Sequence, residues 1–156
     1  MARKVRVSGV GQSRCVKWNP VEGIGSYCAD IGFSFAPFGP RPPWRLEIRM
    51  YFSLVRDNPP RDLLLAFDDA IAFRWEEEYF GGTWLPDDLP QVRGPGTPFT
   101  FPLLIVEDSA WIEKLASRYP LATGDRAHYA FVSLNDTVEI IAGPPVRAEW
   151  IPGIEL

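Results

Sequence analysis

Residues 44–54 read WRLEIRMYFSL, and this stretch contains the clearest structural signal in the chain. Its apolar residues occupy every second position, and they are Trp44, Leu46, Ile48, Met50, Phe52 and Leu54. Such alternation predicts a β-strand with one buried and one solvated face, because successive side chains of a strand point to opposite sides. Arg45 and Arg49 fall on the solvated face and flank Glu47. The stretch therefore predicts a sheet that covers a hydrophobic core.

Other parts of the chain predict further strands. We expect them over residues 27–35, 103–106 and 146–151. Residues 127–142 predict a hairpin with Asn135-Asp136 as a two-residue turn. In that register Phe131 faces Ile140 on the partner strand. Antiparallel pairing is therefore the expected arrangement.

Residues 62–79 fit two patterns. One is a helix with Asp62 as its cap and an apolar stripe at Leu64, Phe67, Ile71 and Trp75. The other is a pair of strands joined at Asp68-Asp69. The aromatic content favours the strands, and the helix stays open as the alternative.

One helix is predicted near residues 109–118. Asp108 or Ser109 can cap it, and Pro120 ends it. The chain contains 16 prolines, and proline is poorly tolerated inside helices and central strands, so a helical bundle is excluded. We expect a single domain over residues 1–156, of the α+β class. Its features would be a mainly antiparallel β-sheet, one helix near 109–118 and long loops rich in proline and glycine.

Charge is distributed unevenly along the chain. Residues 1–61 contain ten Lys and Arg against four acidic residues, a net charge of +6, and residues 62–156 contain six against sixteen, a net charge of −10. Such asymmetry favours a face that meets a charged partner. Eight acidic residues lie between positions 62 and 88. The candidate partner-binding residues are Asp68, Asp69, Glu76, Glu77, Glu78, Asp87 and Asp88, with Trp84 from the proline-rich segment 81–102.

Carboxylates also serve roles other than partner binding. Paired carboxylates perform acid–base catalysis in glycoside hydrolysis, and carboxylates bind Mg²⁺ or Ca²⁺. The consecutive residues Glu76, Glu77 and Glu78 diverge in a strand and in a helix, so they do not converge on one ion. A merely solvated acidic face is as consistent with the pattern as a partner surface. No metal or cofactor is expected.

The remaining motifs predict no catalytic dyad, no zinc site and no phosphate-binding loop. His128 is the only histidine, and a strand histidine beside Glu139 or a loop carbonyl explains it better than a catalytic dyad or a zinc site. Cys15 and Cys28 form no CxxC pair and are expected as free thiols. The glycine pairs match no phosphate-binding loop. With an overall pI near 5.0, nucleic acid is an unexpected partner.

No stretch approaches the roughly 20 apolar residues that span a bilayer, and the first residues contain no signal-peptide core. We therefore expect no membrane partner and a cytoplasmic location.

Two segments resemble parts of known proteins. Residues 67–78, FDDAIAFRWEEE, are similar to a sheet segment of small uncharacterised bacterial proteins, and residues 128–142, HYAFVSLNDTVEIIA, are similar to their C-terminal strand pair. That group looks like the acidic, single-domain immunity-type proteins that accompany secreted bacterial toxins. The resemblance implies an α+β fold and protein binding without catalysis, and it transfers no functional residue.

The leading hypothesis is a non-enzymatic protein-binding module, of the immunity type, that neutralises a basic bacterial toxin through an acidic surface. The alternative is a small-molecule-binding or carboxylate-based enzymatic domain with an aromatic-lined pocket.

Overall fold

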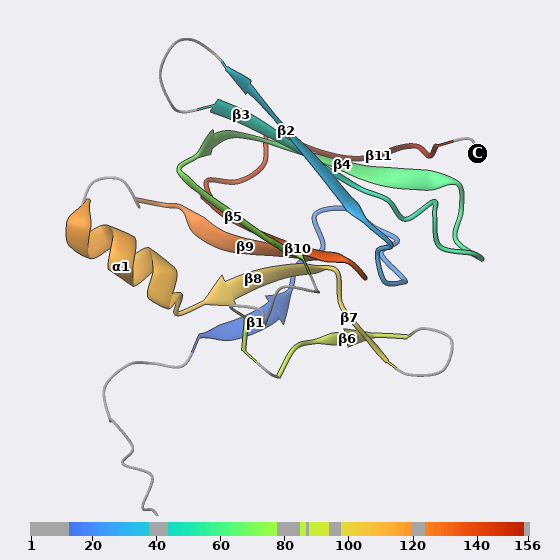
Figure 1. The fold of residues 1–156 in the computed structure, drawn as a ribbon, viewed down its shortest axis with the longest axis horizontal. Coiled ribbons are helices and arrows are strands. Elements are labelled where there is room, and N and C mark those ends of the chain that lie inside the picture. The colour runs from blue at the N-terminus through green and yellow to red at the C-terminus, as the bar shows by residue number, and fades with distance from the viewer. Residues whose placement is uncertain are drawn as a thin grey trace, which may run out of the picture.

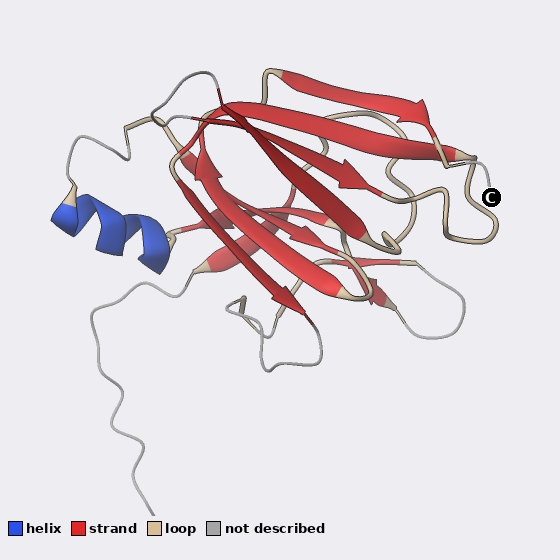
Figure 2. Cartoon of the chain, turned by 45° about the horizontal axis from the view of Figure 1, so that its top comes forward, coloured by secondary structure: helices blue, strands red, loops and turns tan. Residues whose placement is uncertain are grey.

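The computed structural model describes residues 13–37, 44–77, 85–86, 88–93, 98–119 and 124–154. In this part of the chain, antiparallel sheets dominate and one short helix accompanies them (Figure 2). The predicted α+β fold with a mainly antiparallel sheet is thus confirmed.

The strands form two larger sheets and a small ribbon (Figure 1). The first sheet contains, in spatial order, β1 (Arg14–Lys17), β8 (Leu103–Glu107), β9 (Ala127–Val132), β10 (Asp136–Ala142) and β5 (Ala72–Glu77). The second contains β11 (Arg147–Pro152), β4 (Arg61–Ala70), β3 (Trp44–Met50) and β2 (Ile31–Pro37). The ribbon pairs β6 (Gln91–Val92) with β7 (Phe99–Thr100), inside the segment predicted as a long loop. The helix is α1 (Ala110–Arg118).

The hydrophobic core lies between the two larger sheets. The apolar residues of β3 alternate with half-buried ones as predicted, and Leu46, Ile48 and Met50 have no exposed surface. Phe67 of β4 contacts the first sheet, with its ring centroid 5.3 Å from that of Tyr129. Each large side chain buried in this way contributes about 1.5–3 kcal/mol to folding. The period-two pattern is therefore explained by burial between the sheets.

The predicted helix is confirmed. Its first residue follows Ser109, whose Oγ accepts a hydrogen bond from the Ile112 backbone N–H at 3.1 Å. It ends at Arg118, and the next N–H, of Tyr119, donates to the Leu115 carbonyl. Trp111 places α1 beside the first sheet, on the face turned away from the core (Figure 1). No helix of the described residues is long and apolar enough to cross a membrane.

Of the segment 62–79, the structure describes residues 62–77; they form β4 and β5, and the helical alternative is wrong there. The break between β4 and β5 falls at Ile71 and not at the predicted Asp68-Asp69. Contacts of the two aspartates explain the difference. Arg45 donates to Asp68, and the Gly143 N–H donates to Asp69, so both acids are held within the strand.

The hairpin formed by β9 and β10 has a different register from the predicted one. Phe131 faces Val138 and not Ile140. The turn begins earlier, because the Ser133 N–H donates to the Asp136 carbonyl and Ser133 Oγ accepts from the Asp136 N–H. A shift of two positions leaves every side chain on its predicted face.

Candidate functional site

Asp68 and Asp69 are paired with arginines inside the fold. Asp68 accepts a hydrogen bond from Arg45 at 2.8 Å. Asp69 lies 3.5 Å from Arg126 and accepts from the Gly143 N–H at 2.8 Å. Neighbours on a strand point to opposite faces, so the two carboxylates also point apart. They do not join a common acidic patch.

The other predicted site residues lie elsewhere. Glu76 is on β5 opposite Thr137, and its Oε2 atom is buried and receives no hydrogen bond from any described residue. Glu77 points to the other face of β5 and pairs across the ladder with Asp136. Asp88 is exposed on the segment before β6. Glu78, Trp84 and Asp87 lie outside the described residues.

Glu77 belongs to a cluster of three carboxyl groups. Burial raises the pKa of Asp136 to about 6, and a hydrogen bond from its protonated carboxyl to Asp30 and the charges of Asp30 and Glu77 add to the effect. The Trp75 indole N–H donates to Asp136 at 3.0 Å and acts in the opposite direction. Within the described part of the chain, none of the three forms an ion pair with Lys or Arg. Their negative charge is therefore available to a partner.

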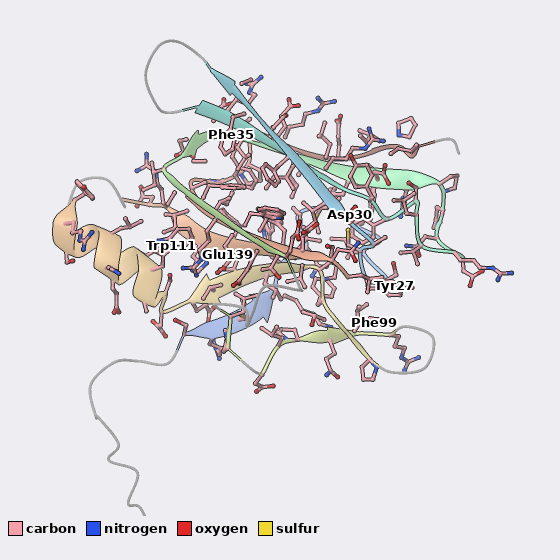
Figure 3. All side chains as sticks on the ribbon, in the orientation of Figure 1. Tyr27, Asp30, Phe35, Phe99, Trp111 and Glu139 are labelled. Atoms are coloured by element: carbon pink, nitrogen blue, oxygen red, sulfur yellow. The ribbon has the colours of Figure 1, made fainter. Side chains whose placement is uncertain are left out.

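Exposed aromatic rings adjoin these carboxyl groups. Trp75 of β5 is 47% exposed, and Phe33 and Phe35 of β2 are 39% and 43% exposed. The ring of Phe33 lies 6.2 Å from Trp75 and 4.8 Å from Phe73, so β2 and β5 adjoin although they belong to different sheets. Each is the end strand of its sheet, and Figure 3 labels Phe35 and Asp30 at the two ends of β2. We call this surface the acidic–aromatic edge; it comprises Asp30, Phe33, Phe35, Phe73, Trp75, Glu77 and Asp136.

Sequence reasoning missed Asp30 and Asp136. Asp136 lies opposite Glu77 because β10 pairs with β5, and the hairpin formed by β9 and β10 does not by itself reveal this pairing. No local sequence pattern marks Asp30 as a site residue. Its neighbour Cys28 accepts a hydrogen bond from the Leu134 N–H, and this distant contact brings Asp30 to the turn.

A second polar cluster lies on the first sheet beside α1. Glu139 accepts two hydrogen bonds from Arg74, both at 2.8 Å, and lies 2.8 Å from His128 Nε2. His128 Nδ1 is 2.7 Å from Ser109 Oγ. The predicted strand histidine beside Glu139 is confirmed. Burial opposes the ionised form of Glu139, but the hydrogen bonds from His128 and Arg74 outweigh it and lower the pKa.

The order serine, histidine, carboxylate is that of a nucleophilic triad, but the surroundings favour a structural role. Ser109 Oγ already accepts the Ile112 N–H as the helix cap, so its proton is directed to His128 Nδ1. Ser109 is only 5% exposed, and Arg74 neutralises Glu139. Ser109, His128 and Glu139 each find their hydrogen-bond partners within this cluster or at the helix cap. We therefore interpret the cluster as a buried network that fixes α1 on the sheet.

Both cysteine side chains are buried. Cys15 and Cys28 are free thiols, and burial raises the pKa of the Cys15 thiol to about 11. In the described ranges, no three His, Cys, Asp or Glu side chains are grouped so as to hold a metal ion. In comparisons with protein-family models, with curated proteins and with solved structures, the chain has no match.

Proposed function

We propose that this protein is a non-enzymatic binding module whose acidic–aromatic edge holds an extended, positively charged segment of a protein partner. The observation that supports the proposal is the cluster of Asp30, Glu77 and Asp136 beside exposed aromatic rings. Carboxylates without internal cations attract Lys and Arg side chains. Aromatic faces bind the same cations through their π-electrons.

The position of β5 suggests how the segment binds. β5 pairs only with β10 among the described strands, so one edge of its backbone is open. An extended peptide can add a strand to such an edge through main-chain hydrogen bonds. Trp75 and Glu77 project from the same face of β5. Alternate side chains of the added strand would therefore meet one aromatic ring and one carboxylate.

The resemblance to immunity-type proteins suggests the class of partner, a basic bacterial toxin whose cationic surface is covered by the complex. We place this encounter in the cytoplasm, where free thiols such as those of Cys15 and Cys28 persist.

The experiment uses a fluorescent peptide of alternating valine and arginine, with a valine–glutamate peptide as the negative control. The variant Asp30→Asn/Glu77→Gln/Asp136→Asn removes the three charges and keeps the side-chain shapes. Its matched control, Glu22→Gln/Asp88→Asn/Glu113→Gln, removes three exposed charges outside the edge.

We expect the edge variant to weaken binding by about tenfold or more, since three ion pairs of up to ~1 kcal/mol each are lost. The control should bind within about threefold of the wild type, because distant exposed charges are screened by salt. Equal affinity of the two variants would refute the proposal. So would equal binding of the arginine and glutamate peptides.

A further inference from the structure

A cavity of about 510 Å³ lies between α1 and the first sheet, on the side of the molecule that carries the buried network. His128 of β9 lines it from the sheet, and Ser109 and Trp111 line it from the cap and the first turn of α1. Figure 3 labels Trp111 at the side of α1 that adjoins the first sheet. The network holds these groups in place. The cavity is therefore bounded by side chains that are fixed by hydrogen bonds.

The charge of the cavity is opposite to that of the protein. Arg74, Lys114 and Arg118 line it, and the described part of its lining contains no Asp or Glu, although the chain has a net charge of −4. Lys114 and Arg118 are one helical turn apart, so they lie on the same side of α1. Among the described residues, neither forms an ion pair. Arg74 is engaged by Glu139 and Trp111.

The size and the remaining lining indicate what kind of anion fits. Cavities of 300–1,000 Å³ accommodate small organic molecules, and 510 Å³ is far more than one inorganic ion requires. Val106, Leu115 and Leu85 supply apolar surface to the same cavity. A suitable ligand combines an anionic group with an apolar or aromatic body.

We propose that this cavity binds a small organic anion, a carboxylate or a phosphate monoester on an apolar body, with Lys114 and Arg118 holding the anionic group. The site is separate from the acidic–aromatic edge in residues and in charge. Binding, without turnover, is expected, because Ser109 is committed to the helix cap and to His128.

Isothermal titration calorimetry with phenyl phosphate and phenylacetate tests the proposal and distinguishes the two anionic groups. Benzyl alcohol and benzylamine serve as the neutral and cationic analogues, and inorganic phosphate lacks the apolar body. We expect saturable binding of at least one aromatic anion, and at least about tenfold weaker binding of the other three compounds. Absence of saturable binding by both anions would overturn the proposal. Equal binding of benzyl alcohol or of inorganic phosphate would also overturn it.

Two variants test whether the ligand binds in this cavity. Lys114→Gln/Arg118→Gln should weaken the anion about tenfold or more, whereas the control Arg56→Gln/Arg93→Gln makes the same charge change at exposed positions elsewhere and should leave binding unchanged. Ala110→Trp adds bulk from an exposed lining position and should also abolish binding. Unchanged binding by Lys114→Gln/Arg118→Gln or by Ala110→Trp would refute the assignment. The edge variant described above should bind the anion normally, so the two proposals fail independently.

Discussion

Replacing Glu139 by glutamine tests the buried network directly. Glu139 is 1% exposed and receives two hydrogen bonds from Arg74 and one from His128. Removing one partner of a buried ion pair costs about 3–5 kcal/mol. Glutamine keeps one acceptor oxygen. Arg74 is also 25% exposed and lies over the Trp111 ring, so its contacts with water and with the indole offset part of this cost. We therefore expect Glu139→Gln to lower the free energy of unfolding by about 3 kcal/mol.

Equilibrium unfolding in urea at pH 7 measures this loss. With a denaturant slope of about 1.5–2 kcal/mol per molar, the midpoint should fall by about 1.5–2 M. The matched control is Glu149→Gln, the same chemical change in an ion pair with Arg147 whose side chains are 47% and 50% exposed. Exposed pairs contribute little, so the control should lose no more than about 0.5–1 kcal/mol.

The effect should also depend on pH. The pKa of Glu139 is lower in the folded protein than its ordinary 4.5. The stability that its ionised form contributes is present above pH 4.5 and is lost as the pH falls through the folded pKa. The difference between wild type and Glu139→Gln should therefore shrink in acid. Losses for Glu139→Gln and Glu149→Gln that agree within about 0.5 kcal/mol at pH 7 would refute the reasoning.

Two further substitutions test other features. Asp136→Asn should stabilise the protein by on the order of 1 kcal/mol at pH 8, after allowance for solvent screening, and change little at pH 4. The pKa of Asp136 is raised from 3.8 to about 6, so its contribution to stability falls as the pH rises between these values; urea titrations with equal effects at both pH values would contradict this. Gly153→Ala should cost about 1–3 kcal/mol, because its Cβ would lie 2.4 Å from the Cβ of Ser53. Gly25→Ala, with nothing within 4 Å, should cost under about 0.5 kcal/mol, and similar thermal melts for the two variants would count against the packing.

The strands and the helix were predictable because their signals are local. The alternation over 44–50 follows from one buried face, and Ser109 caps α1 through a bond to a residue three positions later. The contact between His128 and Glu139 was also predictable. In the observed register the two residues lie on the same face of neighbouring strands, two positions out of line.

The candidate site was less predictable, because it depends on which charges are paired across the fold. Asp68 is neutralised by Arg45, 23 positions earlier, whereas Glu77 lies near two other acidic side chains, Asp30 and Asp136. Nothing in the local sequence distinguishes the two cases. Arg74 was a lone base in an acidic segment, and its role in the network came from pairing with Glu139, 65 positions away. Counting charges along the chain therefore overstated the acidic surface.

The placement of β1 has a consequence for how the chain is made. β1 pairs with β8, so its partner begins at residue 103. During synthesis at about 5–20 residues per second, roughly 86 residues must follow β1 before that partner exists, which takes about 4–17 s. Throughout this interval Cys15 cannot be shielded by its native neighbour Val106 on β8. The nascent protein is thus most vulnerable to thiol oxidation and to premature association before the ribosome has released its last third.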